Sequence, residues 1–204
     1  AALALAVPAQ AETPATPQAG TLARMPAGPV ALAIAERLAD RDGPVPAFYA
    51  ARAHAPLWLA PEGAPGDRAR ALVSTLEKAD SHALPTARYN ASGLTAALDA
   101  TLPRPVAEAA ALDLALTDAF LAYARDVSSG VLRPGRVLSA LDLEPPRPDR
   151  RALLERMAAT AAPARLLADL APGHPDYARL RARLADFRAK AGQDPWGAPL
   201  GGGP

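Results

Sequence analysis

"LDLALTDAFLAYARDVSSGVLRP", residues 112–134, contains the strongest helical pattern in the chain. Apolar side chains recur there at steps of four, four, three and four, which stacks them along one stripe of an α-helix: Leu112, Leu116, Phe120, Tyr123 and Val127. Leu114 and Leu121 widen this stripe. The pattern therefore predicts a central helix over about residues 106–128 that neighbouring elements contact on more than one side.

The same stretch predicts where this helix ends. Gly130 is expected to provide the left-handed exit, with Ser128 and Ser129 as the last turn of the helix. Pro134 would then prevent the helix from resuming. A structural role is thus preferred for this polar exit, and Ser129 is not expected to be a nucleophile.

Helical spacing continues on both sides of the central helix. Pro29 can start a helix whose inner face holds Val30, Ile34 and Leu38. Further helices are predicted within residues 46–56, 66–81, 92–100, 149–160, 163–170 and 171–192. Ser92 and Asp149 are expected to cap two of them. The predicted fold is all-α: a compact orthogonal helical domain of about six to eight helices over residues 29–191, with a flexible N-terminal tail and a Gly/Pro-rich C-terminal tail.

Composition excludes several classes of chemistry. The formal net charge of the 204 residues is +1, which gives no general attraction to a nucleic-acid backbone. The chain has no cysteine, so it can form no disulfide, thiolate metal site or thiol nucleophile. Alanine is abundant and aromatic residues make up only 4%, a bias that favours closely packed helices.

The two ends of the chain suggest export and connection to something else. Residues 1–11 form an apolar run that ends in Ala9-Gln10-Ala11, which is typical of a partial signal peptide; an Ala-rich disordered tail is the alternative. Residues 12–28 are expected to be a flexible linker, and residues 192–204 a second linker. No later stretch reaches the roughly 18 to 20 apolar residues of a membrane span. The predicted location is the periplasm.

Histidines and carboxylates give weak signals for a site. His54, His82 and His174 are far apart and lack the spacing of a helical metal pair, so helix-end or packing roles are expected for them. A pair of carboxylates could support glycoside hydrolysis. The candidates lie on or beside the expected polar face of the central helix and are interpreted as solvated surface: Glu108, Asp113, Asp118 and Asp126.

Three other features are also interpreted as structural. Asp80-Ser81-His82 contains the residue types of a catalytic triad, but adjacent residues do not generally deliver triad geometry. The run 201–203 of glycines lacks the strand and helix that a nucleotide-binding loop needs. The arginine-rich residues 147–190 are expected to form a solvated face. No catalytic residue, cofactor-binding residue or metal ligand is therefore predicted.

Four stretches, taken in order, resemble one known family. "FYAARAHAPLWL" (48–59) is similar to a Phe-Tyr, Arg and Pro-Leu-Trp pattern, and "LVSTLEKADSHALPTARYN" (72–90) to a Leu, Ala, His, Gly-Leu-Pro and Tyr pattern. "LDLALTDAFLAYARDVSSGVLRP" resembles an acidic, Leu-Thr-x-Ala-Phe, Tyr-Ala-x-Asp, Gly and Pro pattern. "LAPGHPDYARLRARLADFR" (170–188) is similar to a Pro-x-His-Pro-x-Tyr-x-x-Leu helix. Together with the terminal "PWGAPLGGGP", these stretches resemble the helical scaffold region of large multidomain L,D-transpeptidases of the Gram-negative envelope.

The resemblance covers about residues 29–204 and has one visible departure, because Ala83 stands where the family pattern has glycine. It implies a protein that acts in peptidoglycan cross-linking and cell-wall remodelling. The family's nucleophile is the cysteine of a Ser/Thr-His-Gly-Cys motif, and this chain contains no such motif. The resemblance therefore implies a non-catalytic scaffold whose partners are its own catalytic and peptidoglycan-binding domains and peptidoglycan itself.

Two other functions remain open from the sequence. The chain could be a self-standing helical binding module for cell-wall polymer or an envelope protein. A hydrolase that uses carboxylates is the least favoured of the three. The sequence leaves open which cross-link is made, the oligomeric state, and whether the arginine-rich region contacts polymer or protein.

Overall fold

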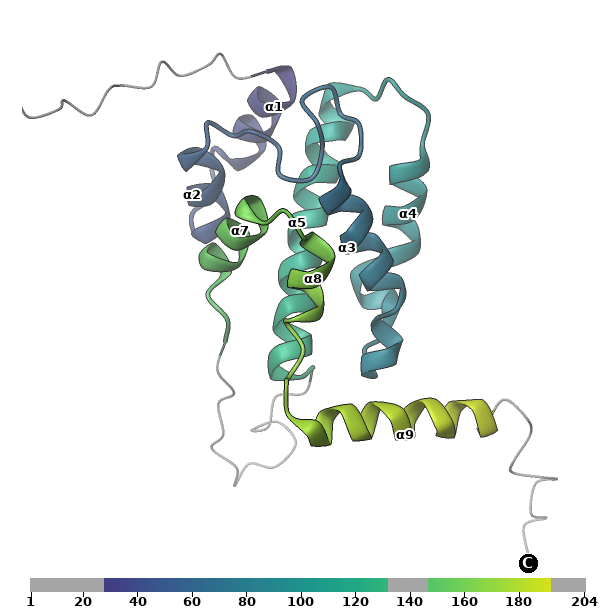
Figure 1. Ribbon diagram of the computed structural model, residues 1–204. Helices are drawn as coiled ribbons and strands as arrows, with labels where there is room; N and C mark the ends of the chain where they lie inside the picture. The colour runs from purple at the N-terminus through teal and green to yellow at the C-terminus, as the bar shows by residue number, and fades with distance from the viewer. Residues whose placement is uncertain (1–27, 132–146, 192–204) are drawn as a thin grey trace, which may run out of the picture.

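The computed structural model describes residues 28–131 and 147–191 (Figure 1). The predicted signal peptide, the 192–204 linker, Pro134 and the linker up to residue 27 lie outside these ranges. Within them the chain is helical, with one isolated β-bridge between Leu59 and Pro65. The α-helices are α1 (Pro29–Leu38), α2 (Pro44–Ala51), α3 (Asp67–Glu77), α4 (Ala91–Asp99), α5 (Val106–Ser129), α7 (Arg150–Ala159), α8 (Pro163–Ala168) and α9 (Pro175–Ala191); two 3₁₀ helices are η1 (Ala79–His82) and η2 (Thr86–Tyr89). The predicted all-α class and the number of helices are confirmed.

The long helix α5 is the central element of the fold, as its sequence predicts. It contacts α1, α3, α4 and η2, and α1 and α2 lie on one side of it while α3 and α4 lie on the other (Figure 1). Its predicted stripe is buried, and so are Leu114 and Leu121. Removing these side chains from water is the main source of stabilisation for such a core. The wide apolar face of α5 is buried because several helices cover it.

The short helices near the C-terminus complete the bundle. α7 packs on α2, and α8 packs on α3. Leu153, Leu154 and Met157 of α7 are buried, as their spacing predicts. α9 differs from the others: it lies across one end of the bundle and contacts η1 (Figure 1).

Local sequence sets several helix ends. Proline occupies the first turn of α1, α2 and α8, where a missing N–H costs nothing. The carboxylate of Asp149 accepts hydrogen bonds from the backbone N–H groups of Arg151 and Ala152, which confirms it as the cap of α7. At the other end of α7, Arg68 of α3 donates to the carbonyls of Met157 at 2.9 Å and Ala158 at 2.7 Å. The guanidinium thus satisfies carbonyl groups that a helix end leaves unpaired.

Two predicted helix ends need correction. Ser92 lies inside α4, and the N-cap position belongs to Asn90, whose backbone is left-handed. Because Asn tolerates this conformation well, the chain turns directly from η2 into α4 and Ser92 is left in the first turn. Gly130 does leave α5 at positive φ, but its angles of φ 81° and ψ 158° lie outside the left-handed helical region. The combination of positive φ and extended ψ that Gly130 adopts is accessible essentially to glycine alone, so the exit from α5 still requires Gly130.

The turn after η1 is left-handed even though it contains no glycine. Ala83 has φ 59° and ψ 22°, and its N–H donates to the carbonyl of Asp80 at 2.8 Å. A Cβ in this conformation costs about 1 to 2 kcal/mol. Ala83 therefore holds a turn conformation that glycine would adopt without this cost.

Candidate functional site

A buried carboxylate joins α5 to the segment that follows α2. Asp113 has no solvent exposure, and one of its oxygens, Oδ1, accepts from the Tyr49 hydroxyl at 2.6 Å and from the Leu57 N–H at 3.1 Å. Its other oxygen, Oδ2, accepts from the N–H groups of Trp58 at 2.9 Å and Leu59 at 3.1 Å. This carboxylate thus binds three successive backbone N–H groups of a segment that has no regular secondary structure to pair them.

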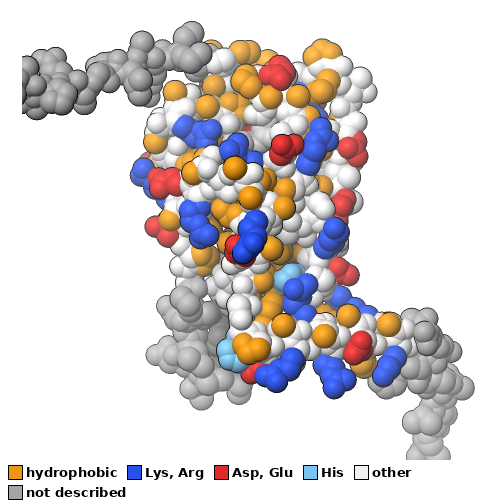
Figure 2. Space-filling view, in the orientation of Figure 1, with side chains coloured by type: hydrophobic (Ala, Val, Ile, Leu, Met, Phe, Trp, Pro, Cys, Tyr) orange, Lys and Arg blue, Asp and Glu red, His pale blue; other side chains and the backbone are white. Residues whose placement is uncertain are grey.

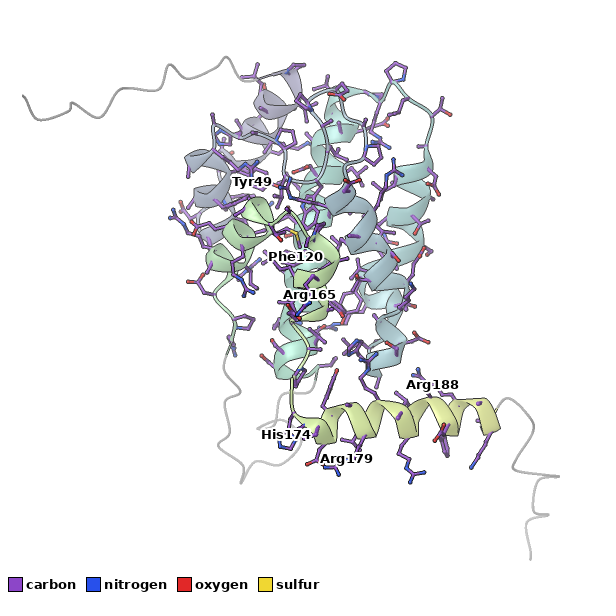
Figure 3. The ribbon with its side chains drawn as sticks, viewed as in Figure 1. Tyr49, Phe120, Arg165, His174, Arg179 and Arg188 are labelled. Carbon is purple, nitrogen blue, oxygen red and sulfur yellow. The ribbon has the colours of Figure 1, made fainter. Side chains whose placement is uncertain are left out.

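A hydroxyl one helical turn later completes this buried junction. Thr117 Oγ1 lies 2.8 Å from the Tyr49 hydroxyl, accepts from the indole N–H of Trp58 at 2.9 Å and donates to the Asp113 carbonyl at 3.1 Å. The Trp58 ring also packs edge-on against Phe120, with ring centroids 5.6 Å apart. We call Tyr49, Trp58, Asp113 and Thr117 the Asp113 junction. Figure 3 labels Tyr49 on α2 and Phe120 on α5.

Burial dominates the electrostatics of the Asp113 junction. Desolvation raises the pKa of Asp113, while the hydrogen bonds from Tyr49 and the three N–H groups act in the opposite direction. Burial and the neighbouring Asp113 carboxylate raise the pKa of Tyr49 well above its ordinary value. Because the acceptor positions of the carboxylate are occupied and water has no access, Asp113 is suited to hold backbone in place and unsuited to exchange protons with a substrate.

A second carboxylate joins α5 to η2. Asp126 is buried, and its Oδ2 accepts from Arg88 Nε at 2.6 Å and from the Tyr89 hydroxyl at 3.0 Å. Arg125 donates two hydrogen bonds to its Oδ1, at 2.9 and 2.7 Å. Tyr89 also packs edge-on against Tyr123, with centroids 5.8 Å apart. We call Arg88, Tyr89, Arg125 and Asp126 the Asp126 junction. Unlike the Asp113 junction, it contains arginine side chains that reach the surface.

These two junctions correct the interpretation of the carboxylates on α5. Glu108 and Asp118 are exposed, as expected, but Asp113 and Asp126 are buried and were wrongly assigned to solvated surface. The 13 positions between them correspond to about 20 Å along a helix, well beyond the separation of roughly 5 to 9.5 Å in glycosidase pairs. Neither carboxylate pairs with the other, so α5 contains no hydrolytic pair at these positions.

A third polar junction attaches α9 to η1. His82 Nδ1 lies 2.6 Å from the Tyr177 hydroxyl, and the two rings stack with centroids 5.8 Å apart. Arg181 donates to the carbonyl of Ser81 at 3.2 Å and to its hydroxyl at 3.1 Å. Arg188 donates to the carbonyl of Asp80 at 2.5 Å. An open groove lies between the two elements and is lined by Arg181 and Arg188 on one side and by Asp80 and Ser81 on the other.

The Asp80-Ser81-His82 stretch is not arranged as a triad. Each of the three residues bonds to a different residue of α9, so these contacts direct the stretch toward α9 and give no chain from carboxylate to imidazole to hydroxyl. Burial and the nearby Arg181 lower the pKa of His82. The polar contacts of η1 described here are thus made with α9.

The other two histidines also have local environments. His174 Nδ1 accepts from the N–H of Asp176 at 3.2 Å, which is a helix-end role at the start of α9, as expected. His54 lies just after α2, in a left-handed conformation with φ 58°. In residues 28–131 and 147–191, no group of three or more His, Asp or Glu side chains is placed to hold a metal ion. Nor is any helix in these two ranges long and apolar enough to cross a membrane.

A sequence signal for the Asp113 junction does exist. Asp113 and Thr117 are four residues apart and both lie beside the apolar stripe, between Leu112, Leu116 and Phe120. Two polar residues four positions apart within the wide apolar side of a helix point toward the same neighbouring element. The extended Pro-Leu-Trp stretch needs acceptors for its backbone N–H groups. The two observations together predict the pairing, whereas the polar-face assignment considered α5 alone.

Comparison with known proteins agrees with the helical architecture. A family model described as "Scaffold domain" matches residues 43–184. The match begins immediately before α2 and extends into α9, so it includes the Asp113 and Asp126 junctions and the His82–Tyr177 and Ser81–Arg181 contacts of the third. No curated protein and no solved structure matched the chain. Since the family model covers more than two thirds of the sequence, the chain belongs to the Scaffold domain family.

Proposed function

We propose that this chain is the non-catalytic scaffold portion of a periplasmic L,D-transpeptidase that acts in peptidoglycan cross-linking and cell-wall remodelling. In this proposal the chain supplies no reacting group, since it has no cysteine. It packs against the catalytic domain and positions that domain relative to the glycan strand. Its partners are the catalytic domain, a peptidoglycan-binding domain and peptidoglycan.

One observation carries the proposal: residues that give the resemblance to L,D-transpeptidases are also the residues of the three polar junctions. Tyr49 and Trp58 of the first stretch meet Thr117 of the third stretch. Tyr89 and His82 of the second stretch meet Asp126 of the third and Tyr177 of the fourth, respectively. The four stretches are therefore parts of one three-dimensional arrangement, which makes a chance likeness of separate short stretches a poorer explanation.

The physical character of the junctions suits a scaffold. The Asp113 junction fixes an irregular segment against α5 through buried hydrogen bonds to a carboxylate, each typically worth about 1.5 to 3 kcal/mol. Such bonds hold backbone in one arrangement. A domain with a rigid interior can support a catalytic domain without taking part in the chemistry.

The first experiment reads the gene beyond the codon of Pro204. The proposal expects a peptidoglycan-binding segment and a Ser/Thr-His-Gly-Cys motif in the same reading frame. A reading frame that encodes neither would remove the main support for the proposal.

The second experiment measures cross-links. The whole reading frame is expressed in cells that lack their own L,D-transpeptidases, and digested sacculi are analysed by mass spectrometry for stem-to-stem cross-links. The intact gene should restore these cross-links, and a gene without the codons for residues 43–184 should not. Unchanged cross-linking by the shortened protein, at equal abundance, would contradict a scaffold role.

The third experiment separates the scaffold from a self-standing wall binder. The purified chain is sedimented with intact sacculi at low salt. The proposal expects little co-sedimentation by the chain alone. Strong co-sedimentation, together with a reading frame that lacks the cysteine motif, would favour the binding module.

A further inference from the structure

Helix α9 is attached to the bundle differently from the other described α-helices. Each of the others buries at least one residue, whereas α9 buries none. Its contacts with η1 are made mostly by polar groups of Tyr177, Arg181 and Arg188. Most helical stability in proteins comes from packing an apolar face, so a helix of 17 residues without a buried residue lacks its usual source of stability.

The apolar residues of α9 follow a heptad pattern. Tyr177, Leu184 and Ala191 occupy one seam position, and Leu180 and Phe187 occupy the other, at alternating steps of three and four. Leu180 is 69% exposed and Phe187 is 59% exposed, the two highest values for large apolar residues in the described ranges. The seam therefore has the spacing of a helix–helix contact. Tyr177 stacks on His82 of η1, whereas Leu180 and Phe187 are left exposed in those ranges.

Basic residues flank this seam on both sides. In the heptad, Arg181 and Arg188 take one flanking position, where they already bond to Ser81 and Asp80 of η1. Asp176, Arg183 and Lys190 take the other flanking position, away from these contacts. α9 carries five basic residues against two acidic ones, and one of these acids, Asp176, pairs with Arg179. Figure 2 shows basic side chains gathered along α9, and Figure 3 shows Arg179 and Arg188 on opposite sides of it.

The flanking charges decide which kind of helix can pack on the seam. Residues at these positions pair across a helix–helix contact and set partner choice. A second copy of α9 would place arginine against arginine, which is unfavourable. We propose that α9 is a docking seam for an amphipathic helix of another protein or domain whose flanking positions are acidic. This inference rests on the residues of α9 and stands independently of the proposed transpeptidase role.

The test uses a synthetic helix of known sequence as the probe. A fluorescent peptide of about 21 residues, with Leu at both seam positions and Glu at both flanking positions, is titrated with the purified 204-residue chain. A second peptide carries Lys in place of Glu. The proposal expects binding of the acidic peptide, at least about tenfold weaker binding of the basic one, and weaker binding as salt rises.

Two double variants test the two halves of the seam. The double variant Leu180→Ser with Phe187→Ser should weaken binding of the acidic peptide by about tenfold or more, because the apolar contact is lost. The double variant Arg183→Glu with Lys190→Glu should weaken binding of the acidic peptide by a similar factor and improve binding of the basic peptide. Neither pair of residues is buried, so both variants should keep the circular dichroism spectrum of the parent chain.

Matched controls come from exposed residues outside α9. Leu32 on α1 is 56% exposed, and Arg165 on α8 pairs with Asp169 on the surface. Leu32→Ser and Arg165→Glu should leave binding unchanged.

Four outcomes would overturn the proposal. These are equal binding of both peptides, no effect of the Leu180 and Phe187 substitutions, self-association of the chain through α9, and no peptide binding. Sedimentation with phosphatidylglycerol vesicles that depends on the same residues, in place of peptide binding, would assign the seam to a membrane surface.

Discussion

The indole N–H of Trp58 donates to the hydroxyl of Thr117 at 2.9 Å, and both side chains are almost completely buried. Thr117→Val keeps the shape of the side chain but leaves the indole donor without this acceptor. A buried donor without a partner costs about 1 to 3 kcal/mol, so Thr117→Val should lower the free energy of unfolding by that amount. Urea denaturation followed by circular dichroism measures the change.

Thr117→Ser is the matched control for this prediction. It keeps the hydroxyl and removes one methyl group, for which a loss of about 1 kcal/mol is expected. If Thr117→Val were no more destabilising than Thr117→Ser, the hydroxyl would not hold the Asp113 junction together.

The two buried carboxylates should differ in importance. Asp113→Ala leaves three buried backbone N–H groups without an acceptor and should cost about 3 to 5 kcal/mol. Asp126→Ala removes the acceptor of Arg88 and Arg125. Their side chains are 40% and 47% exposed and can turn toward water. A smaller loss of about 1 to 3 kcal/mol is expected there. Thermal and urea unfolding of both variants gives the order, and a larger loss for Asp126→Ala would contradict it.

Glycine should be a better residue than alanine at position 83. Ala83→Gly removes the steric cost of the left-handed conformation, although it adds freedom to the unfolded chain. We expect a gain of about 0.5 to 1 kcal/mol in the free energy of unfolding. The control is Ala96→Gly on the exposed face of α4, which should lose about 1 kcal/mol. A loss at both positions would show that the turn in solution is not left-handed.

The attachment of α9 should weaken in acid. The pKa of His82 is lowered by burial and by Arg181, so the attached state favours the neutral ring. The contribution of His82 is therefore present above its ordinary pKa of about 6.5 and is lost as the pH falls through the lowered value. The groups that face this region are Tyr177 and Arg181 of α9, and Tyr123 of α5 lies near Tyr177. None of these three is an acid that would hold a protonated ring.

Hydrogen–deuterium exchange checks this prediction. Amides of α9, corrected for intrinsic rate, should lose protection between about pH 7 and pH 5, while those of α5 should not. His82→Gln should remove most of the pH dependence, and His174→Gln, at the exposed start of α9, should retain it. Equal pH dependence in His82→Gln and the parent chain would exclude His82 as the responsible group.

Sequence periodicity was sufficient for the helices and much of the core. The stripe of α5, the inner faces of α1 and α7 and the cap at Asp149 all follow from spacing and capping rules that act within one element. The errors concern contacts between elements. Asp113 is polar within its helix, and it becomes buried only because the Leu57–Leu59 stretch, more than 50 positions earlier, supplies three donors.

The environment of α9 could not be predicted for a similar reason. Its stripe is helical like that of α5, and spacing alone does not tell whether a partner covers a helix face. The structure places α9 across the end of the bundle, where η1 contacts Tyr177 of the stripe and the arginines on one flank. Position in the fold, which depends on the turns before α9, decides the exposure of Leu180 and Phe187.

The packing of α7 on α2 and of α8 on α3 has a consequence for the order of folding. A chain made from its N-terminus presents α2 and α3 roughly a hundred residues before the helices that cover them. Contacts between such distant segments slow folding and leave apolar surface open to chaperones and proteases in the meantime. Until Ala168 has emerged, this domain remains an unfinished bundle whatever the stability of its central helix.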